Sequence, residues 1–394
     1  MIGYREDWSL DEIHEFELFL SNEDDISPAG IRNSIKSARN PTGENTIRLI
    51  PMYIDRYLSH SIGIDRQMRL SDFLITSVRY DRISLCQYLV DEQEVPVWLG
   101  SASDSLVEVA CEHGSARCLQ FLLERRTPFP SGSCPMEIAC QYGHTQCVAV
   151  LAKYKFFGEP HFFPLHCAAA NGYVSILELP CWSFRQKQAQ NPERNDMSAL
   201  HCAALGGHWD CIQVLLRDGV PVDQPMKHGI TILHIAIKKQ YSDIACRLIR
   251  EWNASILTKI RICTQGSNCL ERACTFGLVD VVRTCLDVLS DDCMDYAQCV
   301  WLACCHGHAE CMKIVLTKYP FLLENQLERY PTTLCWIACR HGHLSCLRIL
   351  KMLDPRFDDV TQLADPLDSP LTVARQYNHM DCAEFVQVNH WTFF

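Results

Sequence analysis

The fold of this chain is decided by residues 198–219, which read SALHCAALGGHWDCIQVLLRDG. In this stretch an alanine, Ala203, precedes a glycine, Gly207, by four positions. Glycine readily adopts the left-handed backbone that ends many helices, so we expect a first helix to stop there. Apolar residues then recur at helical spacing through Leu216, which predicts a second helix with one buried face.

The same pattern recurs about every 33 residues along the chain. We call the alanine that precedes the glycine by four positions the anchor of each copy. The copies that keep both residues have anchors at Ala110, Ala139, Ala168, Ala203, Ala273, Ala303 and Ala338. Weaker copies have anchors at Ala236, Ala374 and Thr76, with Gln240, Asn378 and Tyr80 at the glycine position. The pattern predicts a stack of two-helix units.

These residues resemble the ankyrin repeat family, whose pattern runs Thr-Pro-Leu-His-x-Ala-Ala, then Gly-His, then Val-Val-x-x-Leu-Leu. The best matches begin at Ser198 and at Gly229, where the second copy reads GITILHIA. The resemblance implies an all-α ankyrin-repeat solenoid of about 9–10 stacked helix–turn–helix units with hairpin connections, over residues 70–390.

The residues that flank this array are expected to differ from it. Residues 1–28 carry nine acidic side chains and one base, and a capping box at residues 9–12 predicts a helix over 9–20. This acidic segment either caps the first repeats, detaches to dock elsewhere, or is disordered. Residues 29–69 are interpreted as a linker with a degenerate first repeat, and residues 391–394 as a C-terminal tail.

Two features interrupt the array. Pro180 falls in the second helix of the repeat anchored at Ala168 and should break it, because proline lacks a backbone donor and clashes with the preceding turn. The stretch from Arg185 to Arg194 is rich in Gln and Lys, and we expect it to be an irregular exposed loop.

Composition and charge exclude several classes of function. With 36 Lys+Arg against 47 Asp+Glu the net charge is −11, so we expect no nucleic-acid surface. No apolar run is long enough to cross a bilayer and no signal peptide is recognisable, which predicts no membrane insertion and an intracellular, cytoplasmic or nuclear location. The 24 cysteines are then expected to be reduced thiols.

Cysteine and histidine gather in residues 304–311 and 339–346, which look like zinc sites. However, cysteines recur one and eight positions after the anchors, and both positions face the core, where a thiol behaves as a small hydrophobe. We therefore predict structural cysteines, with no metal and no cofactor. The resemblance assigns the histidines after the glycine position to structural hydrogen bonds.

No phosphate loop, dinucleotide fingerprint, HExxH or GxSxG motif occurs, so we expect no catalytic residues and no enzyme. The function that we favour is a non-catalytic scaffold that binds partner proteins on the concave face of the stack. The alternative is a substrate-recognition adaptor of a cullin-type ubiquitin ligase. Its recruitment box has one near match here, at Leu270, Cys274 and Leu278, which are core positions.

In ankyrin-like stacks, partners are contacted by the exposed ends of the first helices, two and three positions after each anchor. Aromatic and arginine side chains there should contribute most to the binding energy. Trp301 and Trp336, two positions before their anchors, suit packing and contact equally. The residues predicted to bind a partner are His113, Tyr142, Asn171, Lys239, Phe276, His306, Arg340, His341 and Tyr377.

Overall fold

A computed structural model of the chain describes residues 32, 54–55, 58, 64–97, 105–127, 134–156, 163–259, 267–290, 296–323, 334–353 and 369–388. The acidic segment 1–28, most of the predicted linker and degenerate repeat at 29–69, and the tail 391–394 lie outside the described residues. Among these residues nearly all regular structure is helical, with one short pair of strands, which confirms the all-α prediction.

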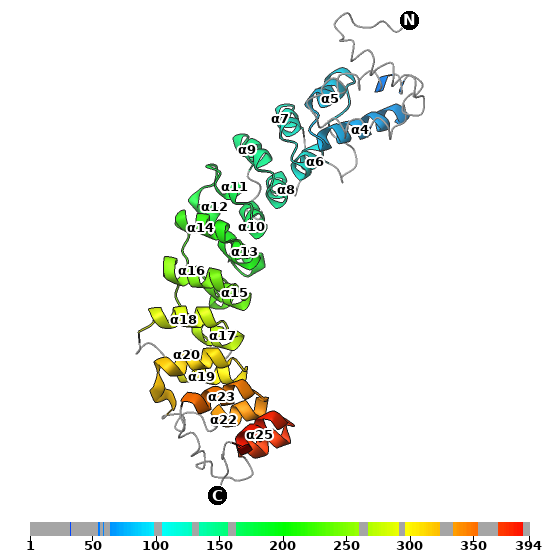
Figure 1. Cartoon of the computed structure of the whole chain (residues 1–394). Helices are drawn as coiled ribbons and strands as arrows, with labels where there is room; N and C mark the ends of the chain where they lie inside the picture. The colour runs from blue at the N-terminus through cyan, green and yellow to red at the C-terminus, as the bar shows by residue number, and fades with distance from the viewer. Residues whose placement is uncertain are drawn as a thin grey trace, which may run out of the picture. The chain divides into compact units, whose positions relative to one another are not determined.

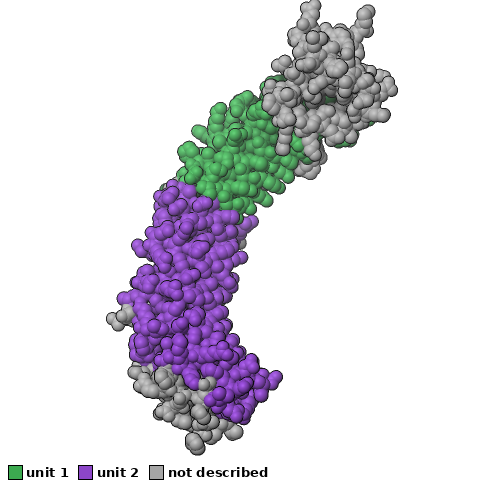
Figure 2. Space-filling view, in the orientation of Figure 1, with its two compact units in different colours: residues 1–187 green, residues 188–394 purple. Residues whose placement is uncertain are grey.

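The chain divides into two compact units, residues 1–187 and 188–394 (Figure 2). In the first unit, each repeat from residue 105 onward is a pair of short antiparallel helices that packs on the pair before it (Figure 1). The described helices of this unit are α4 (Ile64–Arg79), α5 (Ile83–Gln87), the π-helix η2 (Tyr88–Glu92), α6 (Leu106–His113), α7 (Ala116–Glu124), α8 (Pro135–Tyr142), α9 (Thr145–Lys153), α10 (Pro164–Ala170), α11 (Val174–Leu177) and α12 (Phe184–Gln188).

The second unit continues the same helix-pair arrangement. Its first helices, α13, α15, α17, α19, α22 and α24, pack side by side in chain order. The described elements are β1 (Gln190–Asn191), η3 (Pro192–Arg194), β2 (Met197–Ser198), α13 (Ala199–Gly206), α14 (Trp209–Arg217), η4 (Lys227–Gly229), α15 (Ile232–Lys238), α16 (Ser242–Trp252), α17 (Cys269–Phe276), α18 (Val279–Val288), α19 (Tyr296–Cys305), α20 (Ala309–Lys318), η5 (Pro320–Leu323), α22 (Leu334–His341), α23 (Leu344–Leu353), α24 (Pro370–Gln376) and α25 (Met380–Val388).

The two helices of a repeat are buried differently. Six consecutive residues of α13 are buried, from Ala199 to Ala204, because this helix packs on its own partner helix, α14, and on the first helix of the next repeat, α15. The second helix, α14, buries one face through Cys211, Ile212, Leu215 and Leu216. Small alanines in the first helix let adjacent helices approach closely, and the apolar stripe of the second helix closes the core.

A left-handed residue ends the first helix of every described repeat, four positions after the anchor. The amide N–H that follows it donates to the anchor carbonyl, as from His308 to Ala303 at 2.8 Å. This pattern confirms the predicted register in nine repeats. The residues with positive φ at this position are Asp81, Gly114, Gly143, Gly172, Gly207, Gln240, Gly277, Gly307, Gly342 and Asn378.

The predicted register of the copy anchored at Thr76 is wrong by one residue. The N–H of Arg82 donates to the carbonyl of Ser77 at 2.8 Å, and Asp81 has a φ of 54°. Ser77 is therefore the anchor instead of Thr76, and Asp81 replaces Tyr80 at the glycine position. Without a glycine the sequence carries no clear mark of the left-handed residue, and aspartate tolerates this conformation better than tyrosine does.

The region around Pro180 agrees with the prediction in part. The helix before it, α11, is a single turn that ends at Leu177, as expected for a helix broken by proline. The prediction of an irregular exposed loop at 185–194 is wrong, because this stretch contains α12, β1 and η3 and buries Asn191. Strand β1 pairs antiparallel with β2, with Gln190 opposite Ser198. Polar side chains order the stretch, since the Gln190 amide donates to the Pro225 carbonyl at 2.8 Å.

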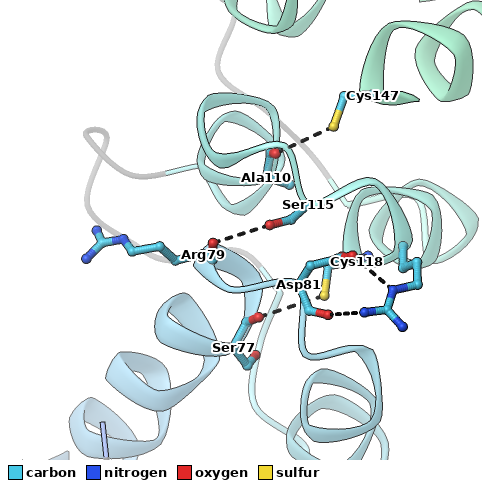
Figure 3. A network of polar contacts seen from close by, with 8 residues as sticks. Ser77, Arg79, Asp81, Ala110, Ser115, Cys118 and Cys147 are labelled. Carbon is cyan, nitrogen blue, oxygen red and sulfur yellow. Dashed lines mark hydrogen bonds and ion pairs between the residues drawn. The ribbon is translucent and has the colours of Figure 1, made fainter. Parts of the chain in front are cut away.

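Thiols join consecutive repeats in the first unit (Figure 3). The Sγ–H of Cys118 points to the carbonyl of Ser77 at 3.9 Å, and that of Cys147 points to the carbonyl of Ala110 at 3.7 Å. Both acceptors are anchors, and both cysteines lie eight positions after the next anchor. The repeated geometry explains why this core position favours a small side chain with a weak donor.

Asp81 adds a second connection between the same repeats (Figure 3). Its carboxylate accepts the amide N–H of Cys118 in the first turn of α7 at 3.0 Å and the Nε–H of Arg117 at 2.9 Å. The next repeat has the small Ser115 where most other repeats carry a ring, which leaves room for the Asp81 side chain. The carboxylate thus caps a helix of the following repeat.

We expect Asp81→Ala to lower the free energy of unfolding by about 1–2 kcal/mol, because α7 loses its cap and the partly buried amide of Cys118 loses its acceptor. Asp81→Gly removes the same carboxylate but relieves the left-handed backbone, so its loss should be smaller. Urea titrations of the two variants check this order. Equal stability of Asp81→Ala and the unchanged chain would show that the carboxylate contributes nothing.

Candidate protein-binding surface

Ring pairs mark the ends of several first helices. The ring three positions after the anchor lies over the ring five positions after it, with centroid distances of 6.4 Å for Tyr142 and His144 and 6.0 Å for His341 and His343. His306 and His308 form a third such pair at 6.4 Å. The outer ring of each pair is exposed and the inner ring is half-buried.

The inner histidine of each pair is fixed by the preceding repeat. Nε2 of His308 lies 3.0 Å from the carbonyl oxygen of Thr275, and Nε2 of His343 lies 3.0 Å from that of Cys305. Since a carbonyl can only accept, Nε2 carries the proton in both. This confirms the structural hydrogen bonds predicted for these histidines, and it means that the outer rings rest on an ordered base.

The predicted partner-binding residues lie at first-helix ends, and all of them are exposed except the half-buried Phe276. His113, Tyr142 and Asn171 belong to the first unit; Lys239, Phe276, His306, Arg340, His341 and Tyr377 belong to the second. Asn171 has a local structural role, because its amide donates to the carbonyl oxygens of Cys167 at 2.9 Å and Gln141 at 3.3 Å.

Arg340 has a distinctive environment. Its Cζ lies 5.1 Å from the ring centroid of Trp336, one turn earlier on α22, and 5.6 Å from that of Tyr377 in the next repeat. Trp336 is half-buried, so it packs and also supports an exposed cation. The spacing of Trp336 and Arg340 could have suggested their contact from sequence. The contribution of Tyr377 depends on how two repeats stack and has no local signal.

The histidines of this surface are biased toward the neutral form. Burial lowers the pKa of His341, and His343, Arg340, His306 and His379 lower it further. Burial also lowers the pKa of His308, with His306 and His343 acting in the same direction. In the first unit, burial lowers the pKa of His113 despite the opposing charge of Glu112. The charged groups that lower the pKa of His341 are all histidines or arginine, and no carboxylate opposes them.

The cysteines that recur one and eight positions after the anchors are in the core, as predicted. Every described cysteine at these two positions is at most 1% exposed, including Cys274, Cys304 and Cys339. Burial raises the pKa of Cys147 to about 12 and that of Cys311 to about 11, so these thiols stay protonated. Among the described residues, no group of three or more His, Cys, Asp or Glu side chains is placed to hold a metal ion.

The residues of the near match to a ligase recruitment box are also in the core. Leu270 and Cys274 are 0% exposed and Leu278 is 9% exposed. These side chains are therefore not available to contact another protein. A search of the described helices finds none that is both long and apolar enough to span a membrane.

Comparison with known proteins gives two findings. A family model described as ankyrin repeats (3 copies) matches residues 106–181 and, overlapping them, 165–260. Protein phosphatase 1 regulatory subunit 27 from Homo sapiens and that from Mus musculus are each 42% identical to this chain over 53 residues. That match is 14% of this chain, which spans about a third (34%) of the length of these curated relatives.

Ankyrin repeats are protein-interaction modules, so protein partners are indicated for this chain. The matched residues include the copies with the fullest motif, and the helix pairs and left-handed residues continue in the same register beyond them. Residues 106–260 of this chain are therefore ankyrin repeats.

Proposed function

We propose that this chain is a non-catalytic scaffold that binds partner proteins on the surface formed by the ends of its first helices. This is the face expected to be concave in such stacks. The observation that carries the proposal is the row of exposed side chains that recurs two and three positions after the anchors, with aromatic, histidine and arginine members.

The order of these side chains supports the proposal. The exposed rings of Tyr142, His306 and His341 rest on rings that are themselves hydrogen-bonded or packed in the preceding repeat. Binding a partner therefore costs little additional side-chain entropy. Tyr142 and Tyr377 are 46% and 48% exposed, which is unusual for large aromatic side chains and is typical of contact residues.

The relatives support a non-catalytic role, since their printed name describes a regulatory subunit of a phosphatase. The described cysteines are free thiols, which supports a reducing compartment, the cytoplasm or the nucleus. The ligase-adaptor alternative has no supporting observation here, because its near-matching residues are buried.

A quantitative affinity capture tests the proposal. A surface variant carries Tyr142→Ala, Phe276→Ala, Arg340→Ala and His341→Ala. A matched control carries four exposed changes on second helices, Arg217→Ala, Val288→Ala, Arg348→Ala and Met352→Ala. After circular dichroism shows that both variants fold, we expect specific partners to fall at least about tenfold with the surface variant alone, a free-energy loss of about 1.4 kcal/mol.

If the surface variant retains every partner of the unchanged chain, this surface is not the binding site. Partners lost equally with both variants would point to general instability and would also count against the assignment. Cullin or elongin captured with all three chains would instead favour the ligase adaptor.

A further inference from the structure

Three consecutive first helices of the second unit have an unusual charge composition. Residues 296–308, 334–343 and 369–379, which are α19, α22, α24 and the turns that end them, contain no Asp or Glu, although 47 of the 394 residues of the chain are acidic. Their ionisable cations are Arg340, Arg375, His306, His308, His341, His343 and His379.

These cations lie on one continuous part of the stack. Helices α19 and α22 pack together, as do α22 and α24. Four groups from three repeats, His343, Arg340, His306 and His379, are near enough to His341 to influence its protonation. We call the exposed or half-exposed members of this region, His306, Trp336, Arg340, His341 and Tyr377, the Arg340 surface.

Among the described residues, Arg340 is held in place by aromatic rings and has no acidic partner. The rings of Trp336 and Tyr377 restrict its side chain. No carboxylate of the described residues forms an ion pair with it. Stacking against rings engages the faces of a guanidinium and leaves its N–H edge free, and that edge matches a carboxylate in two hydrogen bonds.

We propose that the Arg340 surface binds an acidic peptide segment of a partner protein. One carboxylate binds the Arg340 guanidinium, and another lies between the imidazoles of His306 and His341. The rings of Trp336 and Tyr377 contact the aliphatic part of the same segment. This inference rests on the proposed protein-binding function and specifies the chemistry of the partner.

A short acidic peptide fits this surface better than a nucleic acid does. The chain carries a net charge of −11, which repels a long polyanion, whereas a short segment meets only the local cations. Two arginines across three repeats are also few for a phosphate-binding surface, which relies on many Lys and Arg contacts.

Binding should strengthen as the pH falls from about 8 to about 6, because a neighbouring carboxylate favours the charged form of an imidazole. The charged groups that face His341 are His343 and Arg340 from its own repeat, His306 from the preceding one and His379 from the next. All are cations when protonated, so each would add to the attraction of an acidic segment.

The test uses the full chain and fluorescence anisotropy of a labelled oligoglutamate peptide. An oligoglutamine peptide of equal length is the neutral control, and an oligothymidylate of equal charge represents nucleic acids. Arg340→Gln is compared with Arg348→Gln, which removes the same charge from an exposed position on the second helix of the same repeat. We expect the first to weaken oligoglutamate binding at least about tenfold and the second less than about twofold.

Further comparisons keep the test decisive. His306→Asn with His341→Asn should remove the pH dependence while the chain stays folded by circular dichroism. The connection 354–368 carries five aspartates and lies outside the described residues, so these are also replaced by asparagine in a separate variant.

The inference is wrong if Arg340→Gln and Arg348→Gln behave alike, or if oligoglutamine or oligothymidylate binds as tightly as oligoglutamate. It is also wrong if oligoglutamate binds only after the five aspartates are replaced, because the chain itself would then occupy the surface. If captured partners still depend on Arg340 while oligoglutamate does not bind, protein binding stands and the acidic partner is refuted.

Discussion

Gly307→Ala is expected to lower the free energy of unfolding by about 2–3 kcal/mol. Gly307 has a φ of 77°, and a Cβ there would lie 2.6 Å from Nδ1 of His343 in the next repeat. Left-handed backbone costs an alanine about 1–2 kcal/mol. Displacing the imidazole from the Cys305 carbonyl, which it meets at 3.0 Å, costs about 1 kcal/mol more.

Gly229→Ala provides a matched control for this prediction. Gly229 has the same φ of 77°, but a Cβ there meets only the Lys259 carbonyl oxygen, at an ordinary 3.4 Å. Its loss should be limited to the backbone cost. Urea unfolding followed by circular dichroism gives the two losses, and hydrogen exchange in α19 and α22 locates them, since a repeat array need not unfold in one step.

A double-mutant cycle with His343→Ala separates the two contributions at Gly307. Without the ring, Gly307→Ala should cost no more than Gly229→Ala. Equal losses for the two glycines in the unchanged background would mean that the ring moves aside freely, and the contact between glycine and histidine would then not stabilise the stack.

The stability of the chain should fall by about 3 kcal/mol through His234 alone as the pH drops from about 6.5 to about 4. Burial lowers the pKa of His234 to about 4, with a smaller contribution from Arg272, while the hydrogen bond to Thr258 opposes the shift. The folded state therefore holds a neutral imidazole. Below about pH 6.5 the unfolded chain takes up a proton that the folded chain resists, and the stability present above that pH is lost.

The contacts of His234 explain why the neutral form is required. Its Nδ1 accepts from the Thr231 amide at 3.3 Å and lies 2.8 Å from the Thr231 hydroxyl oxygen, while Nε2 lies 3.0 Å from the Thr258 carbonyl oxygen. A proton on Nδ1 would face the amide donor that begins α15. The imidazole thus serves as acceptor and donor at once, as only its neutral form can.

The measurement is the free energy of urea unfolding between about pH 7.5 and about pH 4 for the unchanged chain and His234→Gln. The variant should be less stable at neutral pH, because the cap is lost, yet its stability should fall less steeply with acid. His228→Gln, which removes an exposed imidazole three residues before the N-cap residue Thr231, should keep the original slope. Parallel profiles for all three chains would refute the assignment to His234.

The sequence was sufficient for the repeat and its register in nine repeats, which have glycine, asparagine or, at Gln240, glutamine at the left-handed position. It failed in the repeat that contains Asp81. There the aspartate takes the left-handed conformation, and its carboxylate accepts hydrogen bonds from Arg117 and from the Cys118 amide of the next repeat. It also failed at 185–194, because the order of this stretch depends on a hydrogen bond from the Gln190 amide to the carbonyl of Pro225, which is 35 residues away in the chain. In both places the deciding partner is remote along the chain.

The sequence by itself therefore determined the ankyrin fold, the burial of the recurring cysteines and the position of the exposed row. These follow from local periodicity, since each helix must bury its apolar side and end where the backbone can turn. Only the tertiary structure placed Tyr377 against Arg340 and brought His306 and His379, from neighbouring repeats, near enough to His341 to lower its pKa. Such groupings depend on the stacking of successive repeats, and the physical reason is that no local preference of the backbone encodes the distance between side chains on different helices.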